Sequence, residues 1–74
     1  MGSILLTNRT GRRFGNFVRY EFGEDLFGFY YLDTIRGKSK FIRSLKKSSY
    51  RNPHEFVYVL DNELNRMDNL NYER

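Results

Sequence analysis

The absence of cysteine from a chain of 74 residues is the feature that most limits how this protein can fold. A domain of this size buries only about 60% of the surface that its unfolded chain exposes, so its margin of stability is small. No disulfide can cross-link the chain, and no thiolate can hold a structural zinc ion. It must therefore fold on an apolar core, on a partner, or on both, and a composition that is 39% hydrophobic and 18% aromatic can supply a core. We expect a single domain over residues 1–74.

Composition also bears on where the protein acts. The longest apolar runs, 4–6 and 56–60, are far shorter than the stretch of about 20 apolar residues that spans a membrane. The chain shows no basic segment that is followed by a long apolar one, so we expect no secretion signal. The lack of cysteine is typical of a reducing compartment, so we expect an intracellular, cytoplasmic protein. The chain has no alanine, glutamine or tryptophan and is rich in asparagine, tyrosine and phenylalanine, which leads us to expect a source in a phage or mobile element.

Runs of apolar and β-branched side chains predict a sheet in the first two thirds of the chain. In residues 16–22 apolar and polar side chains alternate, with Val18, Tyr20 and Phe22 on one side, and this period of two is typical of a half-buried strand. Residues 26–35 are apolar on both faces, which indicates a strand that is covered twice or presents aromatic rings outward. Segments with strand character are 4–7, 16–22, 26–35 and 40–47, and we expect turns at 8–13, 23–25 and 36–38.

Residues 40–47 admit two interpretations. A helix would group Phe41, Ile42 and Leu45, whereas a strand would place Phe41, Leu45 and Lys47 on one side together with Arg43. The turn that precedes the segment and its short length favour the strand. We expect residues 48–51 to form a loop.

The clearest local signal marks the start of a helix. Asn52 suits the N-cap, Pro53 suits the first helical position, and Glu55 stands three residues after the cap, as in a capping box. The apolar side chains that recur with helical period are Phe56, Val57, Val59, Leu60, Leu64, Met67 and Leu70. We expect residues 71–74 to fray.

The order β-β-β-β-α predicts an α+β fold, in which a small antiparallel sheet of three to four strands is packed by one C-terminal amphipathic helix. A sheet with one apolar face against a helix is stable where an isolated hairpin is not. The alternative is a small β-barrel with a C-terminal helix. The expected core consists of Val18, Tyr20, Phe22, Tyr30, Leu32 and Ile42 against Phe56, Leu60, Leu64 and Met67.

The net charge of +4 is unevenly distributed along the chain. Residues 1–51 hold 11 basic and 4 acidic side chains, whereas residues 52–74 hold 2 basic and 5 acidic ones. The densest basic segment, 36–51, contains seven Lys and Arg and no acid. Such clustering favours a surface that contacts phosphates, although it also fits a solvated face that keeps a small domain soluble.

Catalysis has few candidate residues here. His54 is the only histidine, and its position predicts a surface residue of the first helical turn. The carboxylates are scattered, and Glu24 and Asp25 fall in a turn, where aspartate commonly forms local hydrogen bonds. The glycines have neither phosphate-loop nor dinucleotide spacing. We expect no enzyme, no cofactor and no metal site.

The sequence offers more candidate residues for binding than for catalysis, because Phe17, Arg19 and Tyr31 fall on the side of the sheet opposite the expected core. Aromatic rings interleaved with cations can stack on bases and neutralise phosphate. The competing interpretation is that a second chain, or closure of the sheet, covers these rings. The candidate nucleic-acid-binding residues are Arg12, Arg13, Phe17, Arg19, Tyr31, Arg36, Lys38, Lys40, Arg43 and Lys47.

In element order, residues 14–70 resemble small DNA-binding domains that lay a three-stranded sheet in the major groove and back it with one C-terminal helix. The resemblance also lies in charge, because the predicted sheet is basic and the predicted helix behind it is acidic. The N-terminal arm-binding domain of phage and transposon integrases is one such family. The plant ethylene-response domain is another, although its usual tryptophan is missing here. The resemblance implies DNA as the partner.

We therefore expect a small basic domain that binds DNA or RNA through its sheet face and turns. The alternative is a non-enzymatic protein-interaction module, an inhibitor or regulator that docks on a larger protein. A homodimer that covers the two-sided strand is compatible with either function. No membrane partner is expected.

Overall fold

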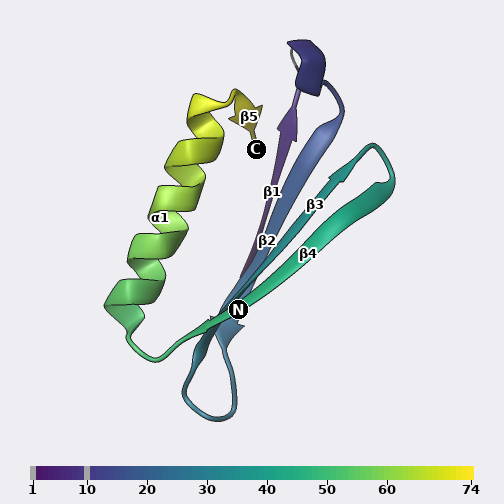
Figure 1. The fold of residues 1–74 in the computed structure, drawn as a ribbon. Coiled ribbons are helices and arrows are strands. Elements are labelled where there is room, and N and C mark those ends of the chain that lie inside the picture. The colour runs from purple at the N-terminus through teal and green to yellow at the C-terminus, as the bar shows by residue number, and fades with distance from the viewer. Residues whose placement is uncertain (1, 10) are drawn as a thin grey trace.

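The computed structural model describes residues 2–9 and 11–74, except for the side chain of Arg13. Its elements are β1 (Gly2–Asn8), the short 3-10 turn η1 (Gly11–Arg13), β2 (Asn16–Glu24), β3 (Tyr30–Lys38), β4 (Phe41–Tyr50), α1 (Pro53–Asn69) and β5 (Tyr72–Glu73). The strands form one antiparallel sheet in the order β4-β3-β2-β1-β5, and α1 lies across one of its faces (Figure 1). The predicted α+β fold is confirmed. The barrel alternative is wrong, because the sheet stays open between its edge strands β4 and β5.

The core lies between α1 and the face of the sheet that it covers. The predicted alternation in β2 is confirmed, since Val18 and Tyr20 are buried there. Across the interface, the Phe56 ring stacks on Tyr30 with their centroids 5.6 Å apart. Buried residues of the core are Leu6, Val18, Tyr20, Leu32, Phe56 and Met67, and partly buried ones packed against them are Ile4, Phe22, Tyr30, Tyr50, Val59, Leu60, Leu64, Leu70 and Tyr72. The core residues that were not in the predicted set are Ile4, Leu6, Tyr50, Val59, Leu70 and Tyr72.

The connection between β2 and β3 differs from the sequence prediction. Residues 26–29 form a loop instead of the start of a strand, because the Asp25 carboxylate accepts hydrogen bonds from the backbone N–H groups of Phe27 and Phe29 at 2.8 and 2.9 Å. Gly28 takes a φ of +81°, which suits glycine. Leu26, predicted to share a face with the core, is 100% exposed in this loop. A local side-chain hydrogen bond therefore outweighs the strand propensity of the segment.

A β-bulge shifts the alternation of β4. Arg36 pairs with Ser44, but Gly37 pairs with Ile42, so Arg43 has no partner across the ladder. The extra residue places Ile42 on the face away from α1, where it is exposed, and the prediction that it belongs to the core is wrong. The same shift corrects the expectation that Phe41, Arg43, Leu45 and Lys47 would share one side.

The C-terminal ends of β3 and β4 each lie three residues beyond the predicted bounds of 35 and 47. The predicted turn at 36–38 is the last part of β3, and the reversal occurs at Ser39 and Lys40, with Ser39 at a φ of +56°. The predicted loop 48–51 is mostly strand, because β4 continues to Tyr50, which pairs with Tyr30 beneath Phe56.

The helix begins where the sequence predicts. The Asn52 side chain accepts a hydrogen bond from the His54 backbone N–H at 2.8 Å, and Pro53 occupies the first turn. The expectation that residues 71–74 fray is wrong. Tyr72 pairs with Asn8 of β1, whose Nδ2 also donates to the Leu70 carbonyl at 3.0 Å. A buried asparagine thus ties the C-terminal strand to the sheet.

Candidate nucleic-acid interface

The face of the sheet away from α1, here called the open face, is not strongly basic. The register places Arg19 between Leu5 and Ile35, and it places Asp33 between Glu21 and Lys47. The Arg19 Nε lies 3.3 Å from Glu21 Oε1, and Lys47 stands directly across from Asp33. Two cations therefore face two carboxylates. This arrangement gives phosphate groups little net attraction at the centre of the open face.

The predicted aromatic residues of the open face rest on glycines. A Cβ added to Gly37 would lie 2.6 Å from the Phe17 ring, and one added to Gly23 would lie 2.9 Å from the Tyr31 hydroxyl oxygen. Both rings are half-buried against the backbone of the neighbouring strand. One side of each ring is therefore already in contact with protein, which leaves less of it for stacking on a base.

Two connections that are distant in sequence meet at one end of the sheet. The Ser39 backbone N–H of the β3–β4 turn donates to the Gly15 carbonyl of the β1–β2 connection at 2.8 Å. In Figure 1 the β3–β4 turn lies at the right, away from α1. We call this end the sheet tip; its exposed cationic and aromatic residues are Arg12, Phe14, Lys38, Lys40 and Phe41. Along the sequence, residues 8–16 and 34–47 contain no Asp or Glu.

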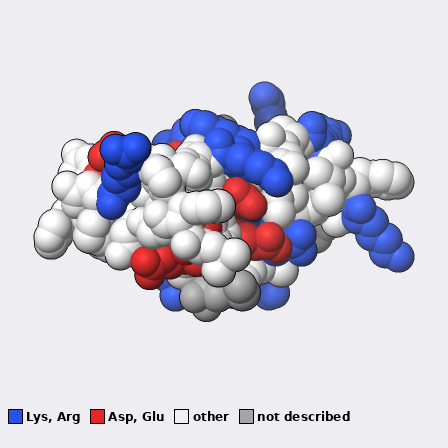
Figure 2. Space-filling view, turned by 90° about the horizontal axis from the view of Figure 1, so that it is seen from below, with Lys and Arg blue, Asp and Glu red and all other residues white. Residues whose placement is uncertain are grey.

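The basic segment continues from the sheet tip along the edge strand β4. Each residue from Phe41 to Lys47 is exposed, and the register directs Lys46 to the helix side and Lys47 to the open face. At the other end of the strand, the Arg51 guanidinium lies 5.2 Å from the centroid of the Phe29 ring. In Figure 2, which shows the molecule from below, Lys and Arg side chains project from the outline, whereas most Asp and Glu side chains lie toward the middle of the view.

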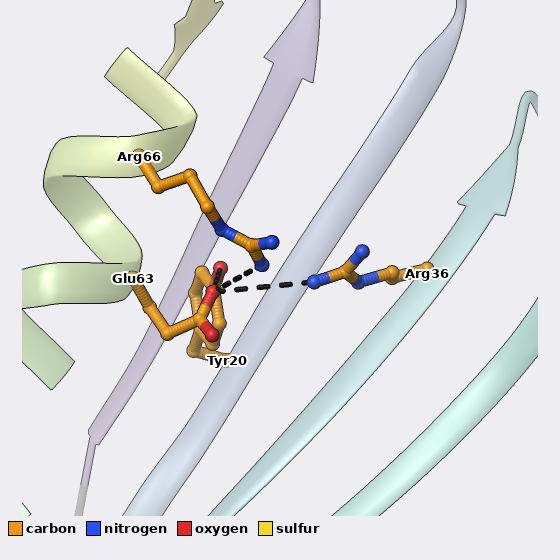
Figure 3. Close-up of polar contacts among 4 residues, drawn as sticks. All are labelled: Tyr20, Arg36, Glu63 and Arg66. Atoms are coloured by element: carbon orange, nitrogen blue, oxygen red, sulfur yellow. Dashed lines mark hydrogen bonds and ion pairs between the residues drawn. The ribbon is translucent and has the colours of Figure 1, made fainter. Parts of the chain in front are cut away.

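A groove lies between α1 and the helix-facing side of β3 and β4, with a volume of about 380 Å³. Arg36 lies in this groove, apart from both the open face and the sheet tip. Its guanidinium is 4.0 Å from the Glu63 carboxylate, which also takes a 2.7 Å ion pair from Arg66 and a 3.2 Å hydrogen bond from the Tyr20 hydroxyl (Figure 3). All three groups address the same oxygen, Oε2 of Glu63.

Burial of Tyr20, followed by the nearby Glu63 charge and its hydrogen bond, raises the pKa of Tyr20 from 10.0 to about 12. The neutral phenol is therefore favoured in the folded state. We expect the stability from this group to be complete below pH 10 and to be lost between pH 10 and 12. The loss should be about 1.4 kcal/mol of unfolding free energy per pH unit. Urea unfolding at several alkaline pH values, compared with Tyr20→Phe, measures it. Equal pH slopes in the two proteins would contradict the assignment.

The candidate binding residues thus divide among several places. Phe17, Arg19, Tyr31 and Lys47 lie on the open face, Arg12, Lys38 and Lys40 at the sheet tip, Arg43 at the bulge and Arg36 in the groove; the side chain of Arg13 lies outside the described residues. Sequence reasoning missed Phe14 and Phe41, although each stands beside a cation in sequence. It also missed Arg66, whose partner Glu63 is three residues away on α1 but is shared with Tyr20 and Arg36 of distant strands.

Other kinds of site were sought within residues 2–9 and 11–74. No group of three or more His, Asp or Glu side chains in this part of the chain is placed to hold a metal ion. Nor does any helix in the same ranges combine the length and apolar character needed to cross a bilayer. Comparison with protein-family models, with curated proteins and with solved structures finds no match for this chain.

Proposed function

We propose that this protein binds nucleic acid through the sheet tip and the adjoining part of β4. The main observation in support of this proposal is the hydrogen bond from Ser39 to Gly15, which holds together two connections that are basic and contain no acid. Cations so placed attract phosphate from both connections at once, and this attraction needs no particular base sequence. The charge balance of the open face favours contacts at the tip over contacts at the centre of the sheet.

Exposed aromatic rings at the same tip supply a second interaction. Phe14 and Phe41 are exposed and flanked by Arg12, Arg13 or Lys40 in sequence. A base stacked on such a ring contributes about 1–3 kcal/mol, and a ring can stack only where the base is unpaired or the duplex is opened. We therefore expect stronger binding to single strands than to duplexes of the same length.

The test is a titration of labelled single-stranded and duplex DNA and of RNA by fluorescence anisotropy at several salt concentrations. Lys38→Ala with Lys40→Ala should weaken binding and make the slope of log K against log salt shallower by about 1.4 for single strands, since each phosphate contact contributes about 0.7. Arg51→Ala with Arg66→Ala removes the same charge away from the tip and is the matched control. It should change the slope little.

Phe41→Ala separates stacking from charge. It should weaken binding to single strands at least several-fold while leaving the salt slope unchanged, because no cation is lost. Binding that ignores salt, or equal losses in the tip and control variants, would contradict the proposal.

We propose docking on a larger protein as the second candidate function, since one observation favours it. The β2–β3 loop presents Leu26 and Phe27 to solvent, and the Asp25 carboxylate holds that loop in a single conformation. Exposed apolar side chains on an ordered loop are typical anchors of protein interfaces. A protein partner that remains bound after nuclease treatment would favour this function over nucleic-acid binding.

A further inference from the structure

The groove between α1 and β3–β4 has the chemistry of an anion site. Its volume of about 380 Å³ falls in the range of small-molecule pockets. Three of its side chains are cationic and one is acidic. The residues that line it are Leu32, Thr34, Arg36, Ser44, Lys46, Ser48, Tyr50, Val59, Glu63 and Arg66.

The cations of the groove outnumber its acid. Glu63 neutralises Arg66 at 2.7 Å, but Arg36 is held only loosely at 4.0 Å, and no ion pair of Lys46 is found among the described residues. Two positive charges thus remain without close compensation. Glu63 Oε2 also accepts the hydrogen bond of the Tyr20 hydroxyl, so three groups share this one oxygen. Figure 3 shows both guanidinium groups turned toward the same point.

Side-chain hydroxyl groups also line the groove. Thr34 is only 8% exposed, lines the groove, and has no hydrogen-bond partner among the described residues. Ser44 stands across the ladder from Arg36, and Ser48 across from Leu32, so both direct their side chains to the same side as Thr34. Hydroxyl groups on this side can donate hydrogen bonds to an anion bound in the groove.

We propose that this groove binds a small phosphomonoester, with the phosphate dianion between Arg36, Lys46 and Arg66 and the organic part against Val59 and Tyr50. A dianion matches the two uncompensated positive charges. Guanidinium groups bind phosphate oxygens through parallel hydrogen bonds, and the Thr34 hydroxyl can donate one more. The apolar wall formed by Leu32, Val59 and Tyr50 provides a surface for a flat organic group.

The probes are inorganic phosphate, adenosine monophosphate and adenosine, titrated at constant ionic strength while the amide resonances of the protein are followed by NMR. Adenosine monophosphate should shift the resonances of Thr34, Lys46 and Arg66 saturably, phosphate should do so more weakly, and adenosine least. An oligonucleotide with a 5′-phosphate, compared with its unphosphorylated form, distinguishes a free metabolite from the end of a nucleic acid. No saturable shift with any phosphate probe would overturn the proposal.

Variants localise the binding. Arg36→Ala and Lys46→Ala should each weaken adenosine monophosphate binding at least tenfold, and Lys46, on the exposed edge strand, can be replaced without disturbing the core. Glu63→Gln keeps an acceptor for Tyr20 but removes the opposing charge, so binding should become several-fold tighter.

Lys40→Ala is the control, because it removes a cation from the sheet tip and leaves the groove intact. Equal weakening by Lys40→Ala and Lys46→Ala would show general charge attraction and overturn the site. Weaker binding in Glu63→Gln would also overturn it, because removal of the opposing charge should favour an anion in the groove. Nucleic-acid binding at the tip is tested by separate variants, so either proposal can fail alone.

Discussion

Replacement of Phe56 by alanine is expected to lower the free energy of unfolding by about 3–5 kcal/mol. Phe56 is 9% exposed and is the point where the first turns of α1 meet the sheet. Its ring stacks on Tyr30 and makes tilted contacts with Phe22 and Tyr50, at centroid distances of 6.3 and 6.4 Å. Truncation of this one side chain therefore removes helix contacts to three strands, β2, β3 and β4.

The effect is large because the domain is small. A chain of this length has a total stability of roughly 4–11 kcal/mol, at about 0.05–0.15 kcal/mol per residue. Urea unfolding followed by far-UV circular dichroism measures the change. Val57→Ala is the matched control, since Val57 is the next residue, is 52% exposed, and should change stability by no more than about 0.5 kcal/mol. Equal midpoints for the two variants would contradict the assigned core.

Replacement of Gly37 by alanine is expected to be the second most damaging change. Gly37 is buried at the bulge, and an added Cβ would overlap the Phe41 backbone carbonyl oxygen and lie 2.6 Å from the Phe17 ring. The ring can turn aside, but the carbonyl belongs to the paired strand and cannot move without opening the bulge. We expect a loss of at least about 1–3 kcal/mol, as for overpacking in a close-packed interior.

Gly23→Ala is the control for this prediction. Its added Cβ would meet only the Tyr31 side chain, at 2.9 Å from the hydroxyl oxygen, and that side chain is half-buried and free to shift. Gly23→Ala should therefore destabilise the domain less than Gly37→Ala in the same unfolding measurement. Amide hydrogen exchange adds a local readout, since Gly37→Ala should expose the amides of β4 near the bulge first. The reverse order of stability would show that the bulge is not rigid.

Part of the candidate site could be predicted from charge alone. Arg12 and Lys38 were predicted as binding residues in basic turns and Lys40 as part of the basic segment 36–51, and the three lie together at the sheet tip. Arg36 was predicted in the same set, but it lies in the groove with Glu63. That difference arises because β3 begins and ends three or more residues later than its composition predicted, which turns a supposed turn residue into a strand residue facing the helix.

The features that the sequence by itself determined are local ones. The Asn52 and Pro53 start of α1, the period of two in β2, and the separation of basic and acidic segments each depend on residues that are close along the chain. Caps, side-chain alternation and charge clusters act over a few residues, so a single sequence displays them directly.

Only the tertiary structure decided which distant segments meet. Three such contacts are the bulge beside Gly37, the pairing of Tyr72 with Asn8, and the hydrogen bond from Ser39 to Gly15. Each joins residues that no local sequence pattern predicts to be partners. Strand register is fixed by the packing of the whole buried face, and a one-residue shift reverses every side chain beyond it. The bulge makes such a shift in β4, and the shifted register directs Lys46 into the groove and Lys47 to the open face.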